Sequence, residues 1–248
     1  IKKDVHLASI SGGTDVVGCI VLGNIFSNVH SGEIQGESLG LEVDIFDDEG
    51  KHVDKETKGE LVIKKPFPTM PIKFWNDNKN IKYKKAYFSK YKNIWHHGDF
   101  IEKTKNGGYI ITGRSDSTLN PGGVRIGTSE IYRQVEKIDF IRESLAVGQM
   151  HGNDDRIILF VVLNKKNDLT IEDVDFIKKK IKENCSPKHV PHRIIQIPEV
   201  PRTKSGKIVE LAVKKAIHGQ KVDNLEALIN PNSISFFEKL YKKKLLDE

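Results

Sequence analysis

The hydrophobic pattern of the chain changes near residues 114–116, and this change constrains the fold more than any other feature. Before it, apolar and polar residues alternate over 41–46, and short strand-like runs recur at 59–63 and 109–112, as in half-buried strands. Turn signals at 47–51 and 106–108 separate these runs. After it, buried-strand runs alternate with helical patterns, which indicates an α/β unit. The sequence thus predicts a β-rich part, residues 1–116, followed by an α/β part, residues 117–248.

Each part has its own expected elements. In the first, short strands and tight turns predict a small barrel or curled sheet, and the three prolines within 66–71 exclude that stretch from a sheet centre. In the second, strands are expected at 145–148, 157–163 and 193–197, and helices at 128–135, 170–183 and 208–218. A Thr or Ser at 128–129 is expected to cap the first helix, and Thr170 starts the second. The apolar residues of 233–246 recur at helical spacing, so this tail is expected to pack on its own domain.

Composition narrows the functional class. The 248 residues carry a formal net charge of +6, and the positive excess lies from Asn164 onward. Such a region suits nucleic acid or a polyanionic small molecule, although charge alone favours a solvated lysine-rich face.

No run approaches the roughly 20 apolar residues of a membrane span. Cys19 and Cys185 are far apart, which argues against a disulfide framework and favours a reduced, cytoplasmic setting. The start lacks Met and an apolar signal core, so we expect no targeting segment and a chain cut from a longer one.

Two short runs in the first part carry groups that can bind a nucleotide. In the run 11–15, Ser-Gly-Gly-Thr-Asp, adjacent glycines let a backbone approach a ligand closely. The threonine hydroxyl can donate to a phosphate oxygen, and the carboxylate can hold Mg²⁺. The run 97–99, His-Gly-Asp, places a carboxylate at an expected strand end, where it can accept ribose hydroxyls. Either run alone is more often an ordinary turn.

Two further runs are basic. The run 113–127 places Arg114 and Arg125 around a glycine-rich loop, and arginine suits fork-like recognition of phosphate or ribose oxygens. The run 201–208, Pro-Arg-Thr-Lys-Ser-Gly-Lys-Ile, opens into a helix, where a lysine could reach negative charge developing on a phosphate. A nucleic-acid-binding loop and a solvated turn are the alternatives, and the solvated turn is favoured when the run is taken alone. The nine histidines show no paired metal-ligand spacing.

In this order the four runs resemble the late motifs of the adenylate-forming superfamily, which comprises acyl-CoA synthetases, luciferases and peptide-synthetase adenylation domains. The runs 113–116 (Gly-Arg-Ser-Asp), 122–125 (Gly-Gly-Val-Arg) and 201–208 are specific together, and the resemblance covers almost the whole chain. The stretches 74–77, 97–100, 119–128, 130–136 and 205–213 are most similar to synthetases that act on acetoacetate. The resemblance implies the β-rich end of a large adenylation domain and a small, mobile α/β lid domain. It implies ATP, Mg²⁺ and CoA with acetoacetate as small-molecule partners, and neither nucleic acid nor a membrane.

The resemblance also implies roles for residues of the first part. Gly13 and Thr14 would contact the adenylate phosphate. Asp15 stands where most of the superfamily has glutamate, and it would help hold Mg²⁺. Asp99 would bind the ribose hydroxyls, with Arg114 beside it.

For the second part, the resemblance implies a hinge, a passage and a catalytic lysine. Asp116 would be the hinge between the domains, and Arg125 would pair with phosphate. Gly123 would line the passage for the pantetheine arm of CoA, and Lys207 would bridge the carboxylate and the α-phosphate during adenylation. Gly12 stands where similar acetyl-specific synthetases carry tryptophan, so it would leave room in the acyl pocket for acetoacetate.

One departure from the superfamily pattern is large. The Ser/Thr/Gly-rich loop that grips the β- and γ-phosphates of ATP is expected upstream of residue 1, so we expect this chain alone to make no acyl-adenylate. Two other interpretations stay open: another short- or branched-chain acyl-CoA ligase, and a non-catalytic module whose basic region binds nucleic acid or a protein. Oligomeric state does not follow from the sequence.

Overall fold

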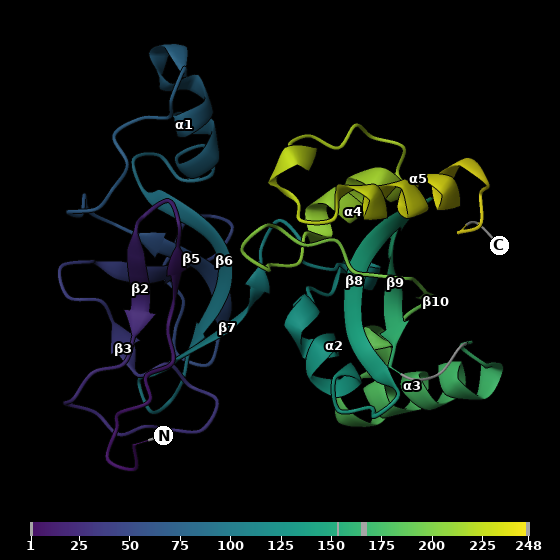
Figure 1. Cartoon of the computed structure of the whole chain (residues 1–248). Coiled ribbons are helices and arrows are strands. Elements are labelled where there is room, and N and C mark those ends of the chain that lie inside the picture. Colours follow the sequence, from purple (N-terminus) through teal and green to yellow (C-terminus); the bar gives the residue numbers. More distant parts are fainter. Residues whose placement is uncertain (1, 153, 165–167, 247–248) are drawn as a thin grey trace. The chain divides into compact units, whose positions relative to one another are not determined.

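The computed structural model describes residues 2–152, 154–164 and 168–246. The chain divides into two units, Ile1–Ser115 and Asp116–Glu248 (Figure 1). The division falls one residue before the boundary expected from the sequence. Cys19 and Cys185 are both free thiols. Within the described residues, no helix combines the length and the apolar character needed to cross a membrane.

The first unit consists mainly of two antiparallel sheets. One has the order β1-β2-β3 and the other the order β4-β5-β6-β7. The elements are β1 Ser11–Gly13, β2 Gly18–Leu22, β3 Gly36–Glu37, β4 Val43–Phe46, β5 Lys58–Ile63, η1 Asn78–Asn80, α1 Ile81–Tyr87, β6 Trp95–Lys103 and β7 Tyr109–Arg114. β6 curves strongly (Figure 1), and its pairing shifts register against both neighbours, near Glu60 and Phe100, as a bulged strand does. Because β4 and β7 form the two edges of the larger sheet, the expected curled sheet is present rather than a closed barrel.

Aromatic packing attaches α1 to the start of β6. Tyr87 stacks on Trp95, with ring centroids 3.7 Å apart and an interplanar angle of 13°. Phe67 and Phe88 meet the same indole edge-on. Aromatic pairs of this kind add to the free energy of burying the rings, so the beginning of β6 is rigidly placed.

The second unit is one three-stranded sheet, of order β10-β9-β8, covered by helices. β8 and β9 are antiparallel, and β10 runs parallel to β9. The elements are η2 Pro121–Gly123, α2 Thr128–Val135, β8 Ile141–His151, β9 Asp154–Leu163, α3 Ile171–Asn184, η3 Pro187–His189, β10 Arg193–Gln196, α4 Glu210–Ile217, η4 Leu225–Ala227, η5 Pro231–Ser233 and α5 Ile234–Lys242.

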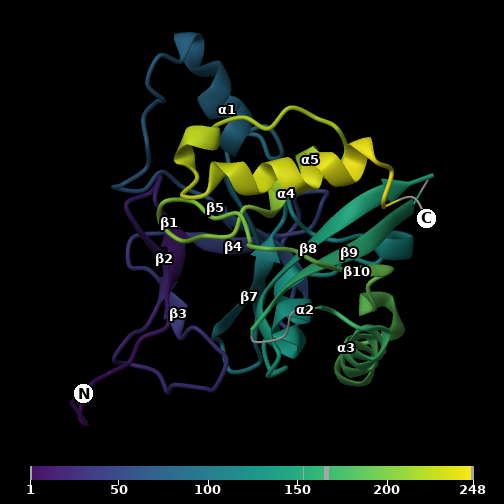
Figure 2. The same ribbon diagram turned by 45° about the vertical axis from the view of Figure 1, so that its right-hand side comes forward.

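Alternate residues of the central strands pack into two cores, one on each face of the sheet, because successive side chains of a strand point to opposite faces. On one face, Leu145, Val147 and Phe160 pack with α4 and α5; on the other, Ala146 and Leu159 pack with α2 and α3 (Figure 2). The edge of the Phe160 ring meets Phe237 of α5, with centroids 5.0 Å apart. The predictions of an α/β unit and of a terminal helix packed on its own domain are confirmed.

Several element boundaries differ from the prediction. α2 begins at Thr128 itself, and Gly127 precedes it, donating its N–H to Glu130 Oε1 over 2.9 Å; the predicted Thr or Ser cap is wrong. α4 begins at Glu210 rather than at 208, because Ile208 pairs with Arg202 in an isolated bridge. β8 is longer than predicted, since it continues as a hairpin with β9.

Candidate functional site

The Gly-Gly-Thr-Asp turn and the His-Gly-Asp run lie against each other in the first unit. Gly12 and Gly13 end β1, and Thr14 and Asp15 follow in a turn. A side chain on Gly13 would place its Cβ 2.8 Å from His97 Cε1. The absence of that side chain therefore lets the turn approach β6 closely, and the two runs form one site.

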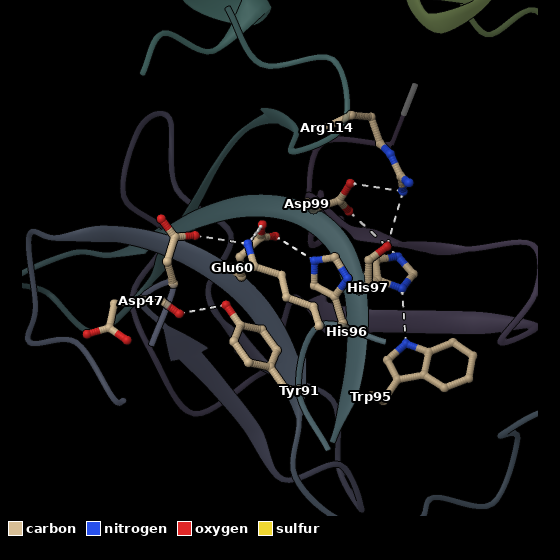
Figure 3. A network of polar contacts seen from close by, with 10 residues as sticks. Asp47, Glu60, Tyr91, Trp95, His96, His97, Asp99 and Arg114 are labelled. Carbon is tan, nitrogen blue, oxygen red and sulfur yellow. Dashed lines mark hydrogen bonds and ion pairs between the residues drawn. The ribbon is translucent and has the colours of Figure 1, made fainter. Parts of the chain in front are cut away.

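Asp99 and Arg114 face each other across the β6–β7 ladder. Arg114 Nη1 lies 3.4 Å from Asp99 Oδ1 and donates to the His97 carbonyl oxygen over 3.2 Å (Figure 3). Gly98, at φ +83°, makes this possible, because a Cβ there would lie 2.8 Å from Arg114 Nη2. Asp99 lies within β6 and not at a strand end as the sequence suggested. Asp99 is largely buried, with 8% of its surface exposed, whereas Arg114 is exposed.

His97 is a member of this site to which the sequence analysis gave no role. Trp95 Nε1 donates to His97 Nδ1 over 3.4 Å. Because an indole N–H can only donate, Nδ1 must accept, and the proton of the neutral imidazole is on Nε2. That nitrogen lies 3.6 Å from Asp99 Oδ2. Burial lowers the pKa of His97, helped by Arg114 and opposed by Asp99, Asp15 and the Gly12 backbone.

Asp15 is tied to α1 in the structure. Tyr87 donates its hydroxyl hydrogen to Asp15 Oδ2. Burial, which is the largest cause, and the Asp15 carboxylate both raise the pKa of Tyr87. Tyr87 also stacks on Trp95, so the carboxylate of Asp15 and the imidazole of His97 are held by adjacent aromatic rings. Within the described residues, no group of three or more His, Cys, Asp or Glu side chains could hold a metal ion.

The neighbourhood of Gly12 offers a different explanation for this glycine. A Cβ at Gly12 would lie 2.1 Å from Gly18 O and 2.7 Å from Cys19 Cα of β2. Both are backbone atoms, so the two strands can approach this closely only with glycine at this position. Strand pairing thus accounts for Gly12 without an acyl pocket.

A charge cluster around the buried Glu60 of β5 lies next to the site, with His96 of β6 and with Lys90 from the segment between α1 and β6 (Figure 3). Lys90 Nζ lies 2.6 Å from Glu60 Oε1, and His96 Nε2 lies 2.9 Å from Glu60 Oε2. Burial alone would raise the pKa of Glu60, but the hydrogen bonds from His96 and Lys90 outweigh it and lower the pKa. His96 and His97 thus point to different faces of β6, and the His96 side supports the strand.

In the second unit, the sequence-predicted residues lie on exposed loops. Asp116 is its first residue and is exposed. Gly123 and Arg125 are exposed on the loop between the paired residues Leu119 and Ile126.

Lys207 ends a tight turn that is well braced. Thr203 N donates to Lys207 O over 2.8 Å, Gly206 N donates to Thr203 O, and Lys207 N donates to Thr203 Oγ1 over 3.1 Å. Arg202 donates to Gly206 O over 2.7 Å and pairs with Glu143 of β8 at 3.0 Å. The backbone of the turn is therefore fixed to the sheet, while the Lys207 side chain is exposed.

A polar contact joins the start of α4 to α2. Tyr132 and Thr128 donate to Glu210 Oε1 over 3.1 and 3.4 Å, and Ala146 N donates to the Tyr132 hydroxyl oxygen over 3.1 Å. Burial raises the pKa of Glu210, and Asp116 adds to this rise. This contact fixes the helix that follows the Lys207 turn.

Comparisons with known proteins show relatives that match nearly the whole of this chain. The chain is 55% identical to the acetoacetyl-coenzyme A synthetase of Rhizobium meliloti over 244 residues, which are 98% of this chain and 37% of the relative. It is 43% identical to the acetoacetyl-CoA synthetase of Gallus gallus over 97% of this chain and 36% of the relative. No protein-family model matches. The chain spans slightly more than a third of the length of these relatives.

Solved structures of CoA ligases superpose on this chain. The acetoacetyl-CoA synthetase from Streptomyces lividans superposes with a TM-score of 0.89 at 40% identity, over 96% of this chain and 36% of that chain. A benzoate CoA ligase from Burkholderia xenovorans superposes with a TM-score of 0.70 at 24% identity, over 84% of this chain and 40% of that chain. The second similarity concerns the fold alone.

Proposed function

We infer that this chain, a member of the acetoacetyl-CoA synthetase family over the third of its relatives' length that it spans, supplies part of an enzyme that ligates acetoacetate to CoA. The observation that carries the proposal is the 55% identity to such a synthetase over 98% of the chain. The arrangement of Gly13, His97, Asp99 and Arg114 in one site supports it.

The proposed reaction has two steps. A carboxylate oxygen of acetoacetate attacks the α-phosphorus of ATP, the bond to pyrophosphate breaks, and acetoacetyl-adenylate forms. The sulfur of CoA then attacks the carbonyl carbon, the thiol proton is released, and AMP leaves with the bonding electrons. Both steps build up charge at one phosphate, so stabilisation of that charge dominates catalysis.

The first unit would bind the adenylate. Asp99 would accept the ribose hydroxyls, with Arg114 beside it, and the N–H and hydroxyl groups of Gly13 and Thr14 would donate to the phosphate. Asp99 is held between a guanidinium and an imidazole, so its carboxylate is oriented before the nucleotide arrives. Such preorganisation reduces the entropy that binding costs.

The second unit would supply mobile groups, with Asp116 as hinge. Lys207 would neutralise the carboxylate and the α-phosphate together during adenylation and then withdraw to admit CoA. Its rigid turn and exposed side chain suit a group that moves with its unit. Arg125 would pair with phosphate, and Gly123 would line the passage for the pantetheine arm.

Mg²⁺ fits this site through Asp15. Magnesium is usually held by one or two carboxylates together with substrate phosphates and water, so one carboxylate beside the phosphate-binding turn is a suitable protein contribution. When bound, the ion would neutralise phosphate charge. Tyr87 would orient Asp15 toward it, through the hydrogen bond already present.

The test uses the complete protein, with ATP–pyrophosphate exchange for adenylation and CoA-dependent thioester formation measured separately. We expect acetoacetate to be preferred over acetate, propionate and branched short-chain acids. We expect Lys207→Ala to reduce adenylation by about 10²–10³-fold, the usual cost of losing one group that stabilises transition-state charge, and to affect thioester formation far less.

Lys204→Ala is the matched control, because Lys204 is an exposed lysine of the same turn; its adenylation rate should stay within about twofold. A preference for another acid would assign a different acyl-CoA ligase. Absence of adenylation with every acid, combined with salt-sensitive binding to nucleic acid, would instead support the basic binding module.

A further inference from the structure

Two backbone hydrogen bonds join the two ends of the loop that carries Gly122 and Gly123. Leu119 N donates to Ile126 O over 2.9 Å, and Ile126 N donates back to Leu119 O over 2.8 Å. Between them, Gly122 and Gly123 take left-handed backbone conformations, at φ +57° and +78°. Such angles are accessible to glycine at little cost, so the loop shape is built into its sequence.

Two consecutive carboxylates at the start of β9 accept N–H groups of this loop. Gly122 N donates to Asp154 Oδ1 over 2.7 Å, and Asn120 N donates to Asp155 Oδ2 over 3.1 Å. The Asp155 N–H also donates to Asp154 Oδ1, over 2.8 Å, which fixes the first carboxylate. The hydrogen bond from Gly122 is the largest cause of a lowered pKa at Asp154. Hydrogen bonds to ionised acceptors are stronger than neutral ones.

A third glycine makes room for this arrangement. Gly148 lies within β8, and a Cβ there would lie 2.2 and 2.5 Å from the two oxygens of Asp155. Glycine weakens a strand interior, so its presence needs a local reason. The carboxylate of Asp155 occupies the space that a side chain at Gly148 would fill.

The two loop glycines have different surroundings. A Cβ at Gly122 would lie 2.5 Å from Lys188 Nζ, whereas a Cβ at Gly123 would have no atom within 4 Å. Both glycines are exposed, but Gly122 has the end of the Lys188 side chain beside it, whereas the space around Gly123 is open. The carboxylates thus hold the loop at Asn120 and Gly122 and leave the space beside Gly123 open.

We propose that Asp154 and Asp155 are positioning residues for the thioester-forming step, which hold the Gly122–Gly123 backbone in the shape that receives the pantetheine arm of CoA. The proposal rests on the proposed function, since it assigns a task in the second half-reaction. It requires no contact between either carboxylate and CoA. Because adenylation precedes CoA binding, the first half-reaction serves as an internal reference.

The experiment uses the complete protein and the variants Asp154→Ala, Asp155→Ala and Gly148→Ala. Each should raise the KM for CoA about tenfold, the size expected when one charge-assisted hydrogen bond is lost. ATP–pyrophosphate exchange with acetoacetate should stay within about twofold of wild type, as expected where no group of the first half-reaction is altered. Asp154→Asn retains an oxygen that can accept from Gly122 N–H, so it should recover most of the wild-type KM.

Asp175→Ala is the control, because Asp175 is an exposed aspartate on α3, remote in sequence from the loop; both half-reactions should be unchanged. An unchanged KM for CoA in all three variants would overturn the proposal. Equal losses in both half-reactions would also overturn it, since they would indicate a general folding role. A wild-type protein that forms no adenylate from acetoacetate would refute the proposed function, and the positioning role with it.

Discussion

At the residue scale, the tautomer of His97 is fixed by the neighbouring Trp95. The indole N–H of Trp95 can only donate, so it selects the tautomer in which the proton of His97 faces Asp99. An imidazolium would put a second N–H against that donor. Burial, which is the largest cause, lowers the pKa of His97 further. The groups facing it are Asp99, Arg114 and Asp15, and a neutral imidazole between them orients Asp99 without cancelling its charge.

This geometry gives a pH-dependent prediction. Because the folded-state pKa of His97 is lowered from 6.5, its contribution to stability is fully present above that pH and is lost as pH falls toward the folded value. His97→Gln removes the titrating group, so its free energy of unfolding relative to wild type should become more favourable as pH is lowered from 8 to 5. Urea denaturation of both proteins at several pH values measures this.

His30→Gln is the matched control, since His30 is exposed in the same unit; it measures what the exchange of an exposed histidine for glutamine does over the same pH range. A His97→Gln difference that does not change with pH would show that His97 is not held neutral.

At the element scale, the sequence predicted what periodicity and turn chemistry determine locally. The order of strands and helices in the second unit and the start of α3 were recoverable; Thr170 and Asp173 form the expected reciprocal cap. Features that depend on a partner distant in sequence could not be predicted from the sequence. Gly12 was interpreted as space for a substrate, and the close approach of β2 to this glycine could not be foreseen.

The candidate site likewise combines features that the sequence predicts locally with features that depend on residues distant in sequence. Its motif residues could be selected from the sequence by resemblance, but the contacts of Trp95 and Tyr87, and those of the Asp154–Asp155 pair in the second unit, form only on folding. An aspartate pair in a hairpin has no local pattern that distinguishes it from a solvated turn. The glycine at 148 was the available signal, since a strand interior rarely tolerates one without a close approach.

The contact between α2 and α4 carries a second element-scale prediction. Tyr132→Phe removes the hydroxyl that accepts from Ala146 N–H and donates to Glu210. The buried N–H loses its partner, so the free energy of unfolding of the second unit should fall by about 1–3 kcal/mol. Chemical denaturation followed by far-ultraviolet circular dichroism measures the change.

Tyr241→Phe is the comparison, because Tyr241 is 49% exposed on α5; its effect should be within about 0.5 kcal/mol. A Tyr132→Phe protein as stable as wild type would mean that Glu210 and Ala146 find other partners, and that α4 does not depend on this contact.

At the scale of the whole molecule, each hydrophobic core found among the described residues is built from one of the two units. One cluster lies in the first unit, and two lie on the two faces of the β8–β9–β10 sheet in the second. A polypeptide of this second unit's size with its own core can fold independently. The first unit instead exposes several large apolar side chains almost fully, among them Leu39 at 94%, Trp75 at 89% and Phe26 at 88%. Exposed apolar surface of this kind favours association.

We therefore expect residues 116–248, expressed alone, to unfold cooperatively as a monomer, and residues 1–115 to aggregate. In the isolated second unit, Phe237→Ala should cost about 3–5 kcal/mol, since it leaves a cavity beside Phe160. Tyr241→Ala, on the exposed side of the same helix, should cost far less because little buried area is lost. Thermal unfolding and sedimentation measure both. Loss of cooperative unfolding in the unsubstituted 116–248 chain would mean that its two cores need the first unit, and it would count against the proposal that the second unit moves as one body carrying Lys207.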